Sequence, residues 1–363
     1  MRRSVALVGL VAAGSSGVPR YAAALTRALG EVADEFPTLE LRLLTTAAGR
    51  ERIGPLRMDV QAVPVRHRLA SGGPGRILLE QLRAASAGSD LLHFFDVSGP
   101  LLAPWKPFVA TIHDASVMHG FGLFRQAYKR RLYPWALGRA RATVAVSGFA
   151  RDEAARHFGA DPAGITVVHS GPGFPPASNG APGRDFGLGE GGFHLYVGNL
   201  NASKNLPFLV RAFDRAKLTT PLVLVGRRGE RFAELELAVR QASSSIKLIF
   251  DASDAEVDHL YRRATALLLP SRYEGFGFTP LEAMGRSCPV LASDIPALRE
   301  VAGEGAMLLP LDDLEAWTSA IRAVDSDLEL REALRLRGGD WVSRYSWETT
   351  ARQVCDLFAR IEL

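Results

Sequence analysis

The sequence predicts an α/β protein made of two Rossmann-like, doubly wound domains that face a central cleft. Three observations lead to this prediction. The chain has 363 residues, which is long for one core and sufficient for two. Short apolar runs alternate with longer helical patterns, as in parallel sheets that are covered on both faces. Residues 171–183 are so rich in Pro, Gly and Ser that they cannot sustain a helix or an inner strand.

The apolar runs predict strands in two series, one on each side of that segment. The first series is 5–10, 39–44, 91–94, 108–112, 143–146 and 165–168. The second series is 193–197, 222–225, 246–250, 266–269, 290–292 and 306–309. Each series suffices for one doubly wound domain, whose ligands bind at the carboxyl ends of the strands. We expect domains at 1–170 and 191–340, a linker at 171–190, and a C-terminal segment at 341–363.

The N-terminus allows two interpretations. Two arginines followed by the apolar stretch 5–13 imitate a secretory signal. Alternatively, residues 5–10 form a first buried strand that leads through a glycine-rich loop to a helix opened by Pro19. The apolar stretch is short and runs directly into that helix, so we favour the strand. Cys288 and Cys355 form no metal-type pair, and this cysteine usage is typical of a reducing compartment. We therefore expect a cytoplasmic protein.

The net charge of +4 is unevenly distributed. Residues 1–187 carry a balance of +8, and residues 188–363 carry −4. A basic first domain suggests an anionic partner such as a membrane surface, with solubility charge as the alternative. The segment 128–135 mixes basic and aromatic residues as membrane-surface helices do, although Pro134 is expected to interrupt it. We expect peripheral contact with the inner face of the membrane as a secondary feature, and no nucleic-acid partner.

One segment combines a strand end, a glycine-rich loop and a helix start. The strand ends at Pro270, glycines stand at 275 and 277, and a helix begins near Thr279. Pro280 then occupies the first helical position, where its missing N–H costs nothing. Exposed backbone N–H groups and the positive end of the helix dipole favour an anion. We expect a diphosphate at this loop.

Lys204 is the cation that such a site needs. It follows the strand at 193–197 and directly precedes a predicted helix at 206–216. Both loops leave the carboxyl ends of strands in one predicted sheet, so Lys204 would neutralise the diphosphate from the opposite side. A solvated lysine in the first helical turn is the alternative, and the helix dipole disfavours it.

The stretch Glu274-Gly-Phe-Gly-Phe-Thr-Pro-Leu-Glu282-Ala-Met resembles the signature of glycosyltransferase family 4, a group of retaining enzymes with the GT-B fold. Thr111-Ile-His113-Asp114 resembles the family's acceptor-domain histidine motif. Other matching segments have the family's order and spacing: 147–151, 165–171, 197–205 and 289–294. The resemblance covers nearly the whole chain. It implies that the last helix, from about 347 to 361, crosses back to the first domain.

The resemblance also implies a role for each matching residue. Glu282 would bind the donor ribose, Glu274 would contact the transferred sugar, and His113 would lie near the sugar and diphosphate. Gly17 would let the first domain approach the donor, and Asn199 stands where many members carry a phosphate-binding arginine. The expected catalytic residues are His113, Glu274 and Lys204. The expected donor contacts are Gly17, Asn199, Lys204, Glu274, Gly275, Phe276, Gly277, Phe278, Thr279 and Glu282.

Structural alternatives exist for several of these residues. Thr279 and Glu282 also fit a capping box, in which the glutamate would serve the helix and not a ligand. A lone histidine is more often a satisfied core residue than a catalytic one, but His113 directly follows a strand. No acidic cluster forms a recognisable cation cage, and Lys204 with the helix dipole can replace a metal. We therefore expect neither a metal nor another cofactor.

The sequence as a whole predicts a retaining glycosyltransferase. It would move a mannosyl- or glucosyl-type sugar from GDP or UDP to a surface glycan, a lipid-linked glycan or a small molecule. Glu274 and Glu282 flank one phosphate loop, so they are a poor acid–nucleophile pair. A nucleotide-sugar epimerase of the same architecture is the main alternative. A catalytically silent subunit is another, and a dinucleotide oxidoreductase lacks its glycine fingerprint here.

Overall fold

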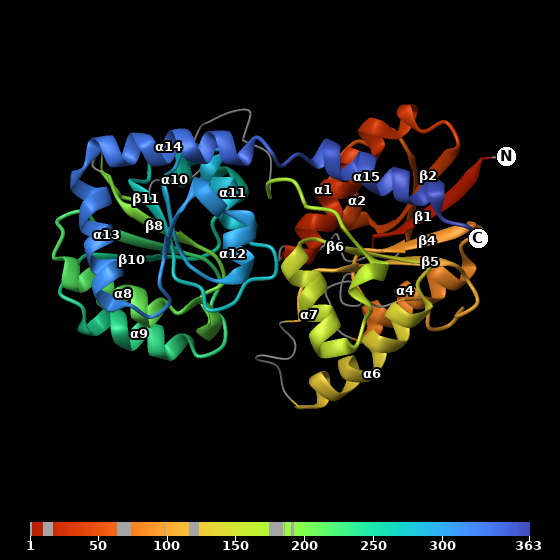
Figure 1. Ribbon diagram of the computed structural model, residues 1–363, viewed down its shortest axis with the longest axis horizontal. Helices are drawn as coiled ribbons and strands as arrows, with labels where there is room; N and C mark the ends of the chain where they lie inside the picture. The colour runs from red at the N-terminus through yellow and green to blue at the C-terminus, as the bar shows by residue number, and fades with distance from the viewer. Residues whose placement is uncertain are drawn as a thin grey trace. The chain divides into compact units, whose positions relative to one another are not determined.

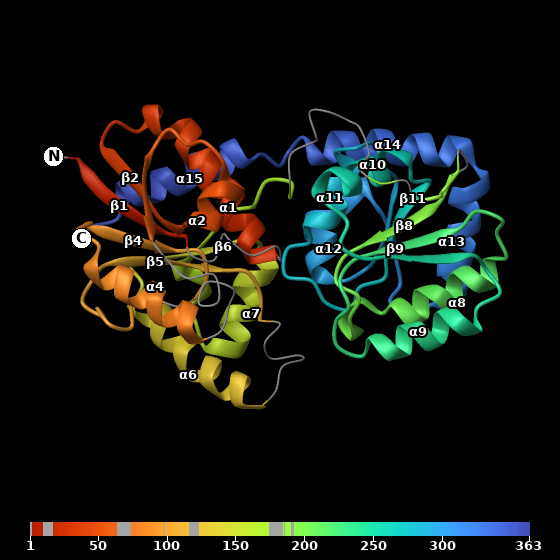
Figure 2. The same ribbon diagram turned by 180° about the vertical axis from the view of Figure 1, so that it is seen from behind.

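The computed structural model describes residues 2–9, 17–63, 74–97, 99–115, 123–173, 184, 186–189 and 192–363. The chain divides into two compact units (Figures 1 and 2). Unit 1 comprises Met1–Gly173 and Tyr345–Leu363, and unit 2 comprises Phe174–Arg344. Most of the segment 171–190, which the sequence assigns to a linker, lies outside the described residues.

Unit 1 contains a seven-stranded sheet of order β3-β2-β1-β4-β5-β6-β7 in which neighbouring strands are parallel. The first strand lies inside this sheet and pairs with both β2 and β4, which confirms the strand interpretation of the N-terminal apolar stretch. The strands are β1 (Arg3–Val8), β2 (Leu39–Thr46), β3 (Asp59–Val63), β4 (Leu91–Phe94), β5 (Phe108–Ile112), β6 (Ala142–Ala145) and β7 (Ile165–Val167).

Helices cover both faces of this sheet, since α1, α2 and α15 lie on one face and α4, α6 and α7 on the other (Figures 1 and 2). This double cover explains why the inner strands are buried along their whole length. The helices are α1 (Gly17–Val32), α2 (Ala47–Ile53), α4 (Pro74–Ser86), α6 (Leu123–Arg139), α7 (Gly148–Phe158) and α15 (Trp347–Arg360), with short 3₁₀ turns η2 (Ala33–Glu35) and η3 (Pro162–Gly164).

The C-terminal helix α15 packs on α1 within unit 1. Its Arg352 forms a two-pronged ion pair with Glu35, at 2.7 and 3.0 Å. At its first residue, the Trp347 indole N–H donates to the carbonyl oxygen of Pro172 at 2.6 Å. A Cβ atom at Gly171 would lie 2.5 Å from Trp347, so only glycine allows this approach. The last helix is therefore an integral part of unit 1.

Unit 2 contains a six-stranded parallel sheet of order β10-β9-β8-β11-β12-β13. The order reverses between β8 and β11, and such switch points are where open α/β sheets bind ligands. The strands are β8 (His194–Val197), β9 (Leu222–Val225), β10 (Ile246–Ile249), β11 (Ala266–Leu269), β12 (Val290–Ser293) and β13 (Met307–Leu309). Together the two sheets confirm the predicted pair of doubly wound α/β domains.

The helices of unit 2 again lie on both faces of the sheet: α8 and α9 on one, α10 and α11 on the other (Figures 1 and 2). The helices are α8 (Leu206–Ala216), α9 (Phe232–Gln241), α10 (Asp254–Arg263), α11 (Phe278–Met284), α12 (Pro296–Val301), α13 (Leu314–Ser326) and α14 (Leu328–Val342), with 3₁₀ turns η4 (Ala202–Lys204) and η5 (Gly303–Gly305). Helix α8 has the bounds that the sequence predicted, because its apolar side chains recur at helical spacing.

Two elements differ from the sequence prediction. Strand β3 was missed, because at the sheet edge Asp59 and Gln61 are exposed and no continuous apolar run forms. Pro134 was expected to interrupt its segment, but α6 continues through it. In the described part of the chain, no helix combines the length and apolarity needed to cross a membrane.

Candidate active site

The carboxyl ends of β8 and β9 form a close-packed support for the loop that carries Lys204. A Cβ atom at Gly226 would lie only 1.7 Å from the carbonyl oxygen of Gly198. Gly198 has a φ of +153°, and a Cβ atom there would lie 2.7 Å from the Tyr196 hydroxyl. Both positions therefore require glycine, and the two loops are fixed against each other.

Lys204 lies directly before α8, in a loop that is fastened on two sides. The N-cap residue Asn205 is left-handed, with φ 55°, and its side-chain amide donates to Asp312 Oδ1 at 3.0 Å. The carbonyl oxygen of Ser203 accepts a hydrogen bond from the backbone N–H of Arg272 at 2.9 Å. These bonds connect the loop after β8 to the loops after β13 and β11.

The structure brings Lys204 and Glu274 together. The Lys204 ammonium donates to Glu274 Oε1 at 2.6 Å, and the Ser271 hydroxyl donates to the same oxygen at 2.7 Å. The Lys204 and Glu274 side chains are 17% and 14% exposed, so the pair is largely desolvated but still reachable from solvent. At this burial the Coulomb attraction between the two charges is less screened than at the surface, and the cost of desolvating them offsets part of it.

Tyr196 lies beside this pair. It is buried, and its hydroxyl donates to the carbonyl oxygen of Asn199 at 3.1 Å. Burial and the negative charge of Glu274 together raise the pKa of Tyr196 well above its usual value, so the phenol stays neutral. Asn199 itself is exposed at the carboxyl edge of the sheet, in the loop that leads to Lys204.

The glycine-rich loop reaches α11 through a left-handed glycine. Gly277 is the N-cap with φ +87°, and a Cβ atom there would come within 3.2 Å of Leu298. Phe276 is buried, and its ring centroid lies 5.2 Å from that of Phe278 in an edge-on contact. Gly275 and Gly277 are partly exposed. The loop is thus anchored by an aromatic contact and leaves its backbone at the edge of the sheet.

The capping-box interpretation of Thr279 and Glu282 is wrong. Helix α11 begins at Phe278, so its N-cap is Gly277, which has no side chain to cap the helix. Pro280 is the third helical residue and not the first, as the sequence predicted. It still fits there because the N–H groups of the first turn have no intrahelical acceptor. Glu282 therefore does not serve the start of its helix.

Glu282 is nearly fully buried, at 1% exposure, and accepts a hydrogen bond on Oε2 from the Tyr261 hydroxyl at 3.1 Å. Its carbonyl oxygen accepts from Arg286, which also donates to Asp258 at 2.8 Å. The carboxylate is thus held from the interior of unit 2, by α10. Any ligand must reach it through the small exposed fraction.

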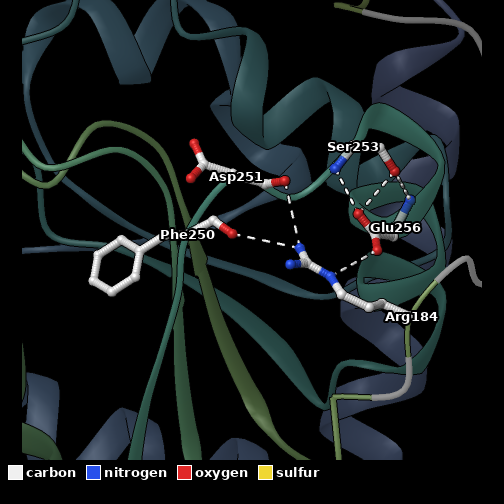
Figure 3. Close-up of polar contacts among 5 residues, drawn as sticks. All are labelled: Arg184, Phe250, Asp251, Ser253 and Glu256. Atoms are coloured by element: carbon white, nitrogen blue, oxygen red, sulfur yellow. Dashed lines mark hydrogen bonds and ion pairs between the residues drawn. The ribbon is translucent and has the colours of Figure 1, made fainter.

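The loop after β10 is held at the same edge of the sheet by Arg184 (Figure 3). The Arg184 Nε donates to Glu256 at 3.1 Å, and its Nη2 donates to the carbonyl oxygens of Phe250 and Asp251, each at 3.4 Å. Hydrogen bonds from Ser253, followed by that of Arg184, lower the pKa of the Glu256 carboxyl. The Asp251 carboxylate points away from these partners (Figure 3). The loop is therefore fixed through its backbone, which leaves this carboxylate outside the cluster.

A cavity of about 300 Å³ opens beside these loops, between the starts of α8 and α9. Lys204, Glu274 and Glu282 are not among its lining residues, so it is separate from the ion pair. Its lining is Leu200, Asn201, Asn205, Leu206, Pro207, Phe208, Arg211, Arg231, Glu234, Leu235 and Arg272.

Unit 1 contains the other two predicted residues, His113 and Gly17. The Nε2 of His113 lies 2.8 Å from the carbonyl oxygen of Phe95, and its ring packs edge-on against Tyr21 at 4.7 Å. Burial lowers the pKa of His113, although Phe95 and two nearby aspartates oppose this shift. Gly17 is the exposed first residue of α1, and a Cβ atom there would meet nothing within 4 Å. Packing in the described structure therefore does not require glycine at position 17.

A second histidine, His93, is expected to make unit 1 sensitive to acid. It is fully buried, its Nε2 lies 2.9 Å from the Thr111 hydroxyl, and its Nδ1 has no partner in the described structure. Burial, with a smaller effect of His113, lowers the pKa of His93 from 6.5 to about 3. At pH values between these two pKa values, His93 binds a proton in the unfolded chain but not in the folded chain. The free energy of unfolding therefore decreases as the pH falls.

Because of His93, we expect the free energy of unfolding to fall by about 1.4 kcal/mol for each pH unit below 6.5. Urea unfolding of wild type and His93→Leu at pH 7, 6 and 5 measures this. The variant should show a shallower pH dependence, and His259→Leu, at a partly exposed position in unit 2, is the control. Equal slopes in wild type and His93→Leu would contradict the assignment.

Sequence reasoning missed three of the side chains that shape the site. Ser271 stands three residues before Glu274, so a search for hydroxyl donors next to the acidic motif could have found it. No local sequence pattern marks Tyr196 or Tyr261, because only folding brings them next to Glu274 and Glu282. Among the described residues, no group of three His, Cys, Asp or Glu side chains could hold a metal ion.

Two family models match the chain. The model described as "Glycosyltransferase Family 4" matches residues 15–171, and the one described as "Glycosyl transferases group 1" matches residues 188–341. They divide the chain between its two halves. The second match contains the loops of Lys204 and Glu274.

Individual proteins show the same similarity. The chain is 28% identical over 267 residues to O-antigen chain mannosyltransferase B of Escherichia coli, covering 69% of each chain. It is 28% identical over 254 residues to O-antigen chain mannosyltransferase RfbU of Salmonella typhimurium, covering 69% of this chain and 68% of the relative. Among solved structures, sucrose-phosphate synthase from Thermosynechococcus elongatus matches with a TM-score of 0.74 at 19% identity, over 99% of both chains.

Proposed function

Since the chain belongs to glycosyltransferase family 4 and is a glycosyltransferase of the GT-B fold, we propose that it transfers a mannosyl- or glucosyl-type sugar from GDP or UDP with retention of configuration. In this reaction the bond between the anomeric carbon and the diphosphate breaks. A bond to an acceptor hydroxyl oxygen forms, and the hydroxyl proton leaves with the diphosphate. The observation that carries the proposal is the contact between Lys204 and Glu274 at the carboxyl edge of the unit 2 sheet.

The two partners of this contact suit the two ends of the breaking bond. The Lys204 ammonium would stabilise the negative charge that develops on the leaving diphosphate. The Glu274 carboxylate would accept hydrogen bonds from the hydroxyls of the sugar. Glu282 is 1% exposed and accepts a hydrogen bond from Tyr261, so it is poorly placed to attack an anomeric carbon. This favours a mechanism without an acid–nucleophile carboxylate pair.

We propose a surface glycan or lipid-linked glycan as the acceptor, with a small molecule as the alternative. The E. coli and Salmonella relatives are named as O-antigen chain mannosyltransferases, which supports this class. The charge of +8 on residues 1–187 and the exposed Arg130 and Arg131 on α6 support peripheral membrane contact from the cytoplasmic side. Co-sedimentation with anionic but not with zwitterionic vesicles tests that contact, and equal sedimentation with both would contradict it.

The donor can be identified by thermal shift with GDP, UDP, ADP and their sugars. At 100 times Kd a ligand should add about 2.7 kcal/mol to the free energy of unfolding, which is measurable. Incubation with labelled nucleotide sugars, with and without lipid and glycan extracts, then tests transfer. Label in an extract component supports the proposal. Interconversion of the donor without an acceptor would indicate an epimerase, and binding without turnover would indicate a silent subunit.

We further propose that no metal takes part, because Lys204 and the N-terminal end of α11 can neutralise the diphosphate. The rate of transfer in about 5 mM EDTA should equal the rate of transfer in magnesium or manganese. Activity that vanishes in EDTA and returns with either cation would overturn this part of the proposal.

A further inference from the structure

The two hydrogen bonds that the described structure gives to the Glu274 side chain both end on one oxygen. Lys204 and Ser271 donate to Oε1, at 2.6 and 2.7 Å. This arrangement leaves Oε2 as the oxygen that can accept a hydrogen bond from a ligand. The Glu274 side chain is 14% exposed, so a ligand can reach it from the edge of the sheet.

The two donors differ in how a diphosphate would affect them. The Lys204 ammonium is charged and its side chain is 17% exposed, so an arriving diphosphate competes with Glu274 for the ammonium. The Ser271 hydroxyl is neutral and fully buried at the end of β11, so it has no comparable reason to turn. Tyr196, on the other side, donates to Asn199 and does not replace either bond.

We propose that Ser271 is a positioning residue that keeps Glu274 directed at the transferred sugar after the donor diphosphate has drawn Lys204 away. Without donor, Lys204 and Ser271 both hold Oε1. With donor, Ser271 holds Oε1 and Oε2 accepts from a sugar hydroxyl. The inference rests on the proposed function, and it assigns the buried hydroxyl a role that appears only in the donor complex.

This order of events predicts different effects on binding and on turnover. Without Ser271, Lys204 still orders Glu274 in the free protein, and the diphosphate still finds Lys204. The carboxylate becomes loose only when the sugar must react. Ser271→Ala should therefore lower kcat about 10-fold, the size of one lost hydrogen bond to a charged group, with GDP and UDP affinities within about 2-fold of wild type.

The experiment measures nucleoside diphosphate release from GDP-mannose and UDP-glucose, with calorimetric titration of GDP and UDP. The matched control is Ser293→Ala, which removes another buried serine hydroxyl, at the end of β12, that has no partner in the described structure. It should leave kcat and nucleotide affinity unchanged. Ser271→Cys, of similar volume, is the second variant if Ser271→Ala does not fold.

Glu274→Gln provides the decisive background. If Ser271 acts through the carboxylate, adding Ser271→Ala to Glu274→Gln should cause no further loss of kcat. Glu274→Gln should also bind bare GDP or UDP about 5-fold more tightly, because Lys204 is released and a nearby negative charge is removed. A wild-type protein that turns over no nucleotide sugar would defeat the proposed function and this inference with it. An active wild type in which Ser271→Ala keeps its kcat, or loses as much again in the Glu274→Gln background, would overturn this inference alone.

Discussion

Replacing Lys204 with alanine is expected to lower kcat/KM about 30- to 150-fold, which corresponds to the loss of about 2–3 kcal/mol from one charge-assisted contact. Binding of GDP and UDP should weaken in the same variant. The Lys204 side chain is 17% exposed, so its attraction to a diphosphate is only partly screened by water. The variant also leaves Glu274 unneutralised beside the diphosphate, which adds repulsion to the lost attraction.

Lys217→Ala is the matched control, because this lysine lies at the other end of α8 and is 64% exposed beside Asp214. It should bind nucleotides and turn over donor as the wild type does. Calorimetric titration and steady-state kinetics on both variants give the comparison. If Lys204→Ala keeps wild-type affinity and rate, the phosphate assignment is wrong. If only its melting temperature falls, Lys204 is a structural partner of Glu274.

Most of the fold follows from one physical regularity. Strands buried on both faces by helices must be apolar along their length, so continuous apolar runs located the inner strands of both sheets. The same regularity fails at an edge, where β3 alternates exposed and half-buried residues and was missed. It also gives no information on Pro134, a residue type that usually ends a helix but lies inside α6 here.

The sequence predicted where the candidate residues stand in the fold, but not which of them are in contact. The motif and the strand ends placed Lys204 and Glu274 at one edge of a sheet, on different parts of the expected donor and not in contact with each other. Their ion pair forms because the loops after β8 and β11 approach each other, and the spacing of residues within either loop does not predict this approach. For Glu282 the spacing from Thr279 left a capping box open as the alternative to ligand binding, and only the helix start at Phe278, two residues earlier than such a box requires, rules it out.

Glu282 is expected to anchor the donor ribose, although the structure buries it against Tyr261. The ribose does not react, so losing this anchor removes binding that is equal in the ground and transition states. Glu282→Gln should weaken GDP or UDP binding about 10- to 100-fold and raise KM with little change in kcat. Glu274→Gln should instead lower kcat more than it raises KM, because in the proposed function Glu274 contacts the sugar whose bond breaks.

A nucleotide without its 2′-hydroxyl separates this role from a structural one. Wild type should bind UDP or GDP more tightly than the 2′-deoxy nucleotide, whereas Glu282→Gln should bind both equally, because its discriminating acceptor is gone. Tyr261→Phe controls for the buried hydrogen bond, and it should lower the melting temperature while keeping the preference for the ribose. If Glu282 only supports the fold, Glu282→Gln will melt several degrees lower and still prefer the nucleotide with the 2′-hydroxyl. In a domain of this size, each kcal/mol of lost unfolding free energy lowers the melting temperature by a few degrees. Equal losses of nucleotide affinity in Glu274→Gln and Glu282→Gln would contradict the division between sugar and ribose.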